Sequence, residues 1–165
     1  MLLAIPKPAE DNSAIQLRGR KLLDIFVEIV QGSLLLVICT SIQLAMQVYA
    51  ARKLREHEGK AEAESSKYTF VIFSAIVMFL LLSHTIHLYL WAIALRVMGA
   101  VGANEEAIYF ALATYTTAGY GDIVLAAEHR LFGAMAAVTG VLAFGLTTAF
   151  LVAMFRRSSA LLKDD

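Results

Sequence analysis

The stretch ATYTTAGYGDIVL, residues 113–125, carries a Gly-Tyr-Gly triplet between two apolar segments of the chain. Glycine adopts positive φ angles that other residues resist, so two glycines in three residues predict an irregular backbone. The chain before the triplet is apolar for only about a dozen residues, which is too short to cross about 30 Å of hydrocarbon. Such a short helix and its irregular return strand survive in a membrane only when protein or a water-filled path surrounds them. The stretch therefore predicts a re-entrant segment beside a pore or a binding cavity.

The composition of the whole chain is typical of a membrane protein. Of the 165 residues, 59% are hydrophobic and 17% are charged, and the mean hydropathy is +0.67. The formal net charge is zero, so we expect no basic surface for nucleic acid and no nucleic-acid partner. The single cysteine, Cys39, excludes a disulfide within one chain.

Three apolar windows, residues 23–51, 68–98 and 131–155, are each long enough to cross a bilayer. They predict an all-α, multi-pass membrane protein with three transmembrane helices. The remaining segments have simpler expected roles. Residues 1–22 form an N-terminal segment with an interfacial helix, residues 52–67 a charged connection that completes the unit 23–67, and residues 156–165 a short tail.

The residues TTAGYGD, at 116–122, resemble the T-x-G-Y-G-D signature of the tetrameric potassium channel superfamily. With its flanking spans, the resemblance covers residues 68–155. The chain is also similar to small bacterial ion-channel proteins that have one extra N-terminal helix. The resemblance implies a pore domain with an outer helix, a pore helix at 104–116, a selectivity filter at 117–121 and an inner helix at 131–155.

The resemblance also implies a function for each residue of the signature. One such segment supplies one quarter of a filter, so the implied assembly is a homotetramer surrounded by membrane lipid. The implied activity is passive, potassium-selective conduction, which is not enzymatic and needs no cofactor or metal besides K⁺ in the pore. The residues implied to coordinate dehydrated K⁺ are Thr117, Ala118, Gly119, Tyr120 and Gly121, with Asp122 at the outer mouth.

Ala118 stands where valine is usual in the family, and this departure keeps other functions open. A smaller side chain packs less behind the filter, which favours a weakly selective monovalent cation channel. A non-conducting, channel-like membrane subunit is a further alternative. A membrane enzyme is disfavoured, because no nucleophile, complete metal set or phosphate-binding loop accompanies the histidines of the second span.

His84 and His87 lie three residues apart in SHTIH and therefore on one face of the second span. A neutral histidine that bonds to a neighbouring helix is one interpretation, with Gln43 of the first span among the candidate partners. A proton-sensitive gate is another, since histidine changes charge near physiological pH. Metal binding is a third, although two histidines are an incomplete ligand set.

Two other features of the spans bear on gating and packing. Gly140 and Gly145 of the last span are candidate hinges of the gate, or alternatively sites where small residues permit close helix contact. Arg96, at the end of the second span, lies at about the depth of Asp24 and Glu28, which predicts an ion pair between Glu28 or Asp24 and Arg96.

The orientation follows from the resemblance more than from the charges. With the filter at the outer face, the N-terminus lies outside and the C-terminus lies in the cytoplasm. Eight basic residues would then face inside and six outside, a weak bias in the direction of the positive-inside rule. The expected location is the bacterial cytoplasmic (inner) membrane.

Overall fold

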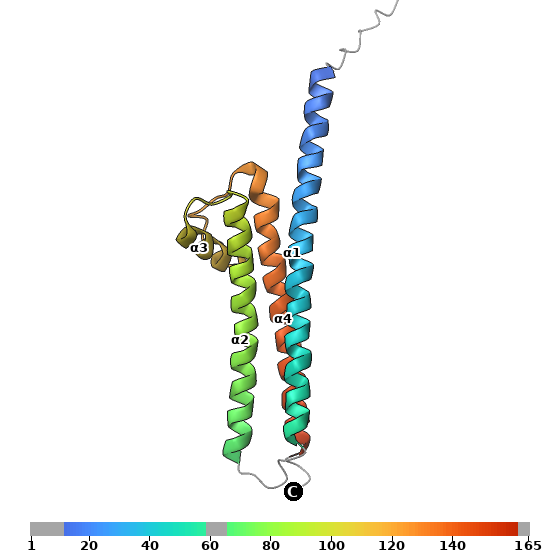
Figure 1. The fold of residues 1–165 in the computed structure, drawn as a ribbon, viewed down its shortest axis with the longest axis vertical. Coiled ribbons are helices and arrows are strands. Elements are labelled where there is room, and N and C mark those ends of the chain that lie inside the picture. The colour runs from blue at the N-terminus through green and yellow to red at the C-terminus, as the bar shows by residue number, and fades with distance from the viewer. Residues whose placement is uncertain (1–11, 59–65, 162–165) are drawn as a thin grey trace, which may run out of the picture.

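The computed structural model describes residues 12–58 and 66–161, and within these residues the chain folds into helices (Figure 1). No β-strand occurs in these two ranges, which confirms the predicted all-α class. The elements, in chain order, are α1 (Asn12–Glu58), α2 (Ser66–Val97), α3 (Asn104–Tyr115), the 3-10 helix η2 (Ala127–His129) and α4 (Arg130–Leu161).

Three of the helices are long and apolar enough to cross a membrane. Their membrane-compatible stretches are Leu22–Glu56 in α1, Phe70–Val97 in α2 and Ala127–Arg156 in η2 and α4. At about 1.5 Å of rise per residue, each of these stretches is longer than a hydrocarbon core of about 30 Å. The three spans predicted from hydropathy are thus confirmed as membrane-compatible helices.

The long helices extend beyond the predicted spans. Residues 12–22 belong to α1 itself and do not form a separate interfacial helix, while residues 1–11 lie outside the described residues. Both prolines of the chain, Pro6 and Pro8, precede Asn12, so no proline interrupts α1. At the other end α1 continues to Glu58, and residues 59–65 of the charged connection lie outside the described part. The expected tail is helical up to Leu161, and residues 162–165 are again outside it.

One stripe of α1 packs against α2 and α4 (Figure 1). The buried positions of this helix recur every three, four or seven residues, which places them on one face. They are Glu28, Gly32, Cys39, Gln43, Gln47 and Ala50. Large apolar side chains cover the other faces, as a surface in contact with lipid requires.

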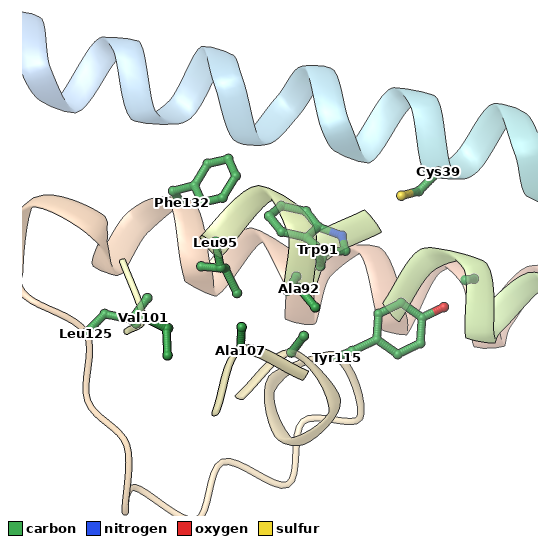
Figure 2. Packing of buried hydrophobic residues seen from close by; sticks show 12 residues of the cluster. Cys39, Trp91, Ala92, Leu95, Val101, Ala107, Tyr115, Leu125 and Phe132 are labelled. Atoms are coloured by element: carbon green, nitrogen blue, oxygen red, sulfur yellow. The ribbon is translucent and has the colours of Figure 1, made fainter. Parts of the chain in front are cut away.

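The short helix α3 packs against α2 and α4 at the end of the bundle where α4 begins (Figure 1). It contains twelve residues and is therefore only about 18 Å long. The small side chains of Ala107 and Ala111 are buried, which lets α3 approach the other helices closely. Figure 2 shows Ala107 and Tyr115 facing Trp91 of α2, whose ring lies 5.1 Å from that of Phe132 in α4. This core fixes α3, and with it the stretch that follows.

Candidate functional site

The Gly-Tyr-Gly stretch begins where α3 ends. The first turn of α3 carries Glu105 and Glu106, and negative charge is favoured at the positive end of a helix dipole. The helix ends at Tyr115 and is capped by Thr116, whose backbone N–H donates to the carbonyl of Leu112 at 3.0 Å. The negative end of α3 therefore faces the residues of the predicted filter.

Backbone hydrogen bonds tie the predicted filter, residues 117–121, to the last turn of α3. The N–H of Thr117 donates to the carbonyl of Thr114 at 2.9 Å. The N–H of Gly119 reaches back to the carbonyl of Ala113 at 3.1 Å. The position of the filter segment is thus set by α3 and by the residues that hold α3.

The backbone φ angle is positive at every second residue of the filter segment. Thr117, Gly119 and Gly121 have φ angles of +60°, +51° and +79°, whereas Ala118 and Tyr120 keep negative φ. Glycine takes positive φ without steric cost, but threonine does not, so Thr117 is a site of local backbone strain. Reversing φ at alternate residues rotates alternate peptide groups, so carbonyls that would alternate along an extended strand can face one side.

The side chain of Asp122 is bonded to Tyr109 on α3. The Tyr109 hydroxyl donates to Oδ2 of Asp122 at 2.6 Å, across a sequence separation of 13 residues. This hydrogen bond lowers the pKa of Asp122 below its ordinary value of 3.8. Asp122 is therefore a fixed negative charge at the end of the filter segment.

The residues of the predicted filter are exposed in the single chain. Residues 116–122 are all exposed, and Tyr120 keeps 75% of its side-chain surface accessible. The segment combines a strained backbone with side chains that no other described part of the chain covers. Such a segment is suited to an interface with other molecules. The structure thus brings Thr117 to Asp122 together as one continuous exposed stretch.

His84 and His87 bond to α3 and α4 rather than directly to α1. Both Nδ1 atoms contact the Tyr115 hydroxyl, that of His84 at 2.8 Å and that of His87 at 3.1 Å. The Nε2 of His84 contacts the Thr147 hydroxyl at 3.0 Å. The interpretation of hydrogen-bonded histidines matches this geometry. The suggested partner Gln43 is one link further away, bonded to Thr147 at 2.9 Å.

The two other interpretations of the histidine pair are metal binding and pH sensing. Within the described residues, no group of three or more potential ligands among histidine, cysteine, aspartate and glutamate could hold a metal ion. The hydrogen-bond partners of both rings are hydroxyl groups and not carboxylates. The role of His84 and His87 as a pH sensor stays a prediction.

Sequence reasoning missed Tyr115 and Thr147 as members of this cluster. Tyr115 is 2% exposed, and its hydroxyl has to find a partner in an apolar core. A tyrosine at the end of a short apolar helix was the available signal. The sequence contains no comparable signal for Thr147, because threonine is common on membrane helices, where its hydroxyl often bonds to the backbone of its own helix.

The predicted ion pair between Glu28 and Arg96 does not form. Both residues lie in the described part of the chain, and each has another partner. The Glu28 carboxylate accepts a hydrogen bond from the backbone N–H of Phe132 at 3.3 Å, in the first turn of α4. The Nε of Arg96 donates to Oδ1 of Asn104 at 3.1 Å. The first N–H groups of a helix lack internal partners, so the start of α4 is an alternative site for the buried carboxylate of Glu28.

The two candidate hinge glycines differ in their surroundings. A Cβ at Gly140 would collide with the backbone carbonyl of Tyr115, so glycine here permits the close approach of α3 to α4. A Cβ at Gly145 would meet nothing within 4 Å in this chain. Packing therefore accounts for Gly140, and bending of α4 at either glycine stays a prediction.

Comparison with known proteins agrees with the position of this site. A protein-family model described as "Ion channel" matches residues 68–157, which comprise most of α2, all of α3, the candidate filter and most of α4. No curated protein and no solved structure matched the chain. The matched region leaves α1 outside it.

Proposed function

Because the chain belongs to this family of ion channels, we propose that it is a potassium channel that conducts K⁺ passively through a filter formed at residues 117–121. The observation that carries the proposal is the alternating backbone of the filter segment, with positive φ at Thr117, Gly119 and Gly121. The chain is an integral membrane protein with three membrane-compatible helices, and its function is transport and not catalysis.

The filter segment suits a dehydrated cation. Potassium-channel filters replace the hydration shell of the ion with backbone carbonyl oxygens, as is known for this class of pore. Alternating handedness supports a row of carbonyls on one side of the segment, from Thr117 to Gly121. Asp122 adds a negative charge beside the outer end, where cations would gather.

We propose that α3 is a re-entrant pore helix. Its twelve residues span about 18 Å, and its buried alanines pack it against α2 and α4. The partial negative charge of its C-terminal end favours a cation near the start of the filter segment. Helical hydrogen bonds pair the backbone groups in the middle of α3, and packing against α2 and α4 keeps the short helix away from lipid.

We propose a homotetramer. One chain contributes one filter segment, which leaves residues 116–122 exposed. Exposed apolar side chains of α4, including Val138, Val141 and Phe144, leave a large face for contact with other chains or lipid. Four copies around one axis would bring four filter segments together and form a closed ring.

We propose the bacterial inner membrane as the location, with the filter near the outer face. α3 lies at the end of the bundle where α4 begins, and the C-terminal end of α1 and the N-terminal end of α2 lie at the opposite end (Figure 1). With the filter outside, the N-terminus is outside, and the connection and the C-terminus face the cytoplasm. The weak excess of basic residues on the cytoplasmic side is consistent with this orientation.

The alternative within the same class is a weakly selective monovalent cation channel. Ala118 is exposed in the single chain and offers little side-chain volume behind the filter. A less supported filter would distinguish K⁺ from Na⁺ less well. A subunit that keeps the fold without conducting is the remaining alternative.

Flux measurements distinguish these functions. Purified protein in liposomes is tested for K⁺ uptake and, in parallel, for Na⁺ uptake. We expect K⁺ flux without Na⁺ flux. Equal fluxes would support the weakly selective channel, and no flux from a correctly assembled oligomer would contradict conduction.

Two matched glycine variants test whether the filter segment is the conducting element. Gly121→Ala places a Cβ at a φ of +79° inside the segment. Gly99→Ala makes the same change at a φ of +72° in the loop after α2, where a Cβ likewise has open space. We expect Gly121→Ala to abolish selective K⁺ flux and Gly99→Ala to retain it. Equal loss in both variants would show that backbone strain in general, and not the filter, is responsible.

A further inference from the structure

A buried tyrosine at the end of α3 is anchored twice, through its side chain and through its main chain. The Tyr115 hydroxyl contacts His84 and His87 of α2 at 2.8 and 3.1 Å. Its backbone carbonyl lies against Gly140 of α4 so closely that no Cβ fits between them. Figure 2 shows the Tyr115 ring at one end of the core cluster, with its hydroxyl pointing toward α2. The proposed filter begins two residues later, at Thr117.

The contact with His84 continues through a chain of hydrogen bonds to α1. The Nε2 of His84 contacts the Thr147 hydroxyl of α4 at 3.0 Å. The Gln43 side chain of α1 donates to the same hydroxyl at 2.9 Å and accepts from the Ser83 hydroxyl at 2.7 Å. Gln43 and Ser83 are fully buried. The chain of contacts therefore links α1, α4, α2 and α3 inside the bundle.

One arrangement of protons satisfies every contact from Gln43 to His87 with neutral groups. Gln43 donates to the oxygen of Thr147, and the Thr147 hydroxyl donates to Nε2 of His84. The Nδ1–H of His84 donates to the oxygen of Tyr115, and the Tyr115 hydroxyl donates to Nδ1 of His87. His84 donates through Nδ1–H and accepts at Nε2, and His87 accepts at Nδ1, as neutral imidazoles allow. The buried Nε2 of His87 makes no hydrogen bond within the described residues. Removing the Thr147 hydroxyl would therefore break two links at once.

We propose that the Tyr115 hydroxyl is a positioning group for the filter, and that the chain Gln43–Thr147–His84–Tyr115 makes the ion preference of the filter depend on the packing of α1. This inference rests on the proposed function, since it requires a selective filter at residues 117–121. Buried hydrogen bonds fix orientation strongly, because an unpaired partner in a low-dielectric interior is costly. The backbone bonds from Thr117 and Gly119 to the last turn of α3 pass a displacement of α3 on to the filter.

Two isosteric substitutions and a matched control test the proposal. Tyr115→Phe removes only the hydroxyl that contacts the histidines. Thr147→Val removes the hydroxyl that joins α1 to His84. Thr139→Val is the control, because Thr139 is a buried threonine of the same helix whose hydroxyl bonds to the carbonyl of Met135 in its own helix at 3.0 Å.

The measurement is the affinity of the purified full-length protein for K⁺ and for Na⁺, by titration calorimetry after its assembly is verified by native mass. Calorimetry reports on the filter even when a gate is closed. We expect Tyr115→Phe and Thr147→Val each to reduce the K⁺ to Na⁺ affinity ratio roughly fivefold, the loss that corresponds to about one hydrogen bond. Thr139→Val should leave the ratio unchanged. The double variant should lose no more than the larger single loss, because both changes interrupt the same chain.

The outcomes separate this inference from the proposed function. A wild-type protein without K⁺ preference would overturn both. A K⁺ preference in the wild type that Thr147→Val leaves intact would overturn the coupling to α1 alone. If Tyr115→Phe does not assemble, Thr147→Val still decides, since it lies on α4 away from the filter. An equal loss in Thr139→Val and Thr147→Val would also overturn the inference, because any buried hydroxyl of α4 would then have the same effect.

Discussion

At the scale of single residues, the hydroxyl of Tyr109 controls the charge of Asp122. The hydrogen bond lowers the pKa of Asp122, so its stabilising effect is present above the ordinary pKa of 3.8 and is lost as the pH falls through the lowered value. Tyr109→Phe should therefore raise the pKa of Asp122 and decrease the melting temperature at neutral pH. The difference in melting temperature between wild type and variant should disappear in strong acid.

The measurement is thermal unfolding of the wild type and of Tyr109→Phe across a series of acidic and neutral pH values. Tyr89→Phe serves as the control, because Tyr89 is a half-exposed tyrosine of α2 whose hydroxyl makes no hydrogen bond among the described residues. A loss in Tyr109→Phe that does not vary with pH would show that the hydroxyl stabilises the protein independently of the charge on Asp122.

The filter segment and its neighbours show how much of the site the sequence predicts at this scale. Positive φ at Gly119 and Gly121 follows from residue type, because only glycine takes that conformation freely. Positive φ at Thr117 does not, since the fold imposes it. The partner of Asp122 was missed because the two residues are 13 positions apart, and the turn of the chain after α3 that brings them together is not visible in the sequence. Glu28 was assigned the wrong partner because its rotation about the axis of α1, which points it toward α4, is set by tertiary packing.

At the scale of helices, the closeness of α3 to α4 depends on Gly140. Gly140→Ala would force a Cβ against the backbone carbonyl of Tyr115, which cannot move without displacing α3. We expect the substitution to destabilise the protein by about 1–3 kcal/mol, the usual cost of overfilling a packed site. Gly145→Ala, in the same helix with open space within the chain, should keep or slightly increase stability, since alanine favours helix.

Melting temperatures of the two variants test this difference. A variant Gly140→Ala as stable as Gly145→Ala would mean that the contact between α3 and α4 adjusts easily, and packing would no longer explain the glycine. The comparison also bears on gating: a role of Gly145 in bending should appear as changed channel opening without a loss of stability.

The existence of the three long helices was predicted correctly, whereas their ends and the contacts between them were predicted less well. Hydropathy located the three spans because the membrane selects long apolar segments. It did not locate the start of α1, since residues 12–22 continue the helix by local propensity and carry too much polarity to be counted as membrane. The cluster around His84 was only partly predicted, because the choice of Tyr115 and Thr147 as partners depends on how three helices are rotated toward one another.

At the scale of the whole molecule, the exposed filter segment predicts the size of the assembly. A single chain leaves residues 116–122 uncovered and carries only one such segment, with positive φ at Thr117, Gly119 and Gly121. A closed ring of identical chains has one axis on which these segments can meet. Four copies give the geometry that the potassium-channel filter requires.

Mixing tests this number directly. Tagged and untagged chains of different mass are produced together, extracted in mild detergent and weighed as intact assemblies by native mass spectrometry. An assembly gives one more species than it has subunits when the two unmixed assemblies are counted, so a tetramer gives five masses, whereas a dimer gives three and a trimer four. K⁺ in the buffer should stabilise the assembly relative to Na⁺, because an ion bound on the axis contacts every subunit and binds only the assembled form. An assembly of another size would contradict a shared potassium filter. A tetramer that is equally stable in K⁺ and in Na⁺ would also contradict it, because the contacts of α4 alone would then have to hold the ring together.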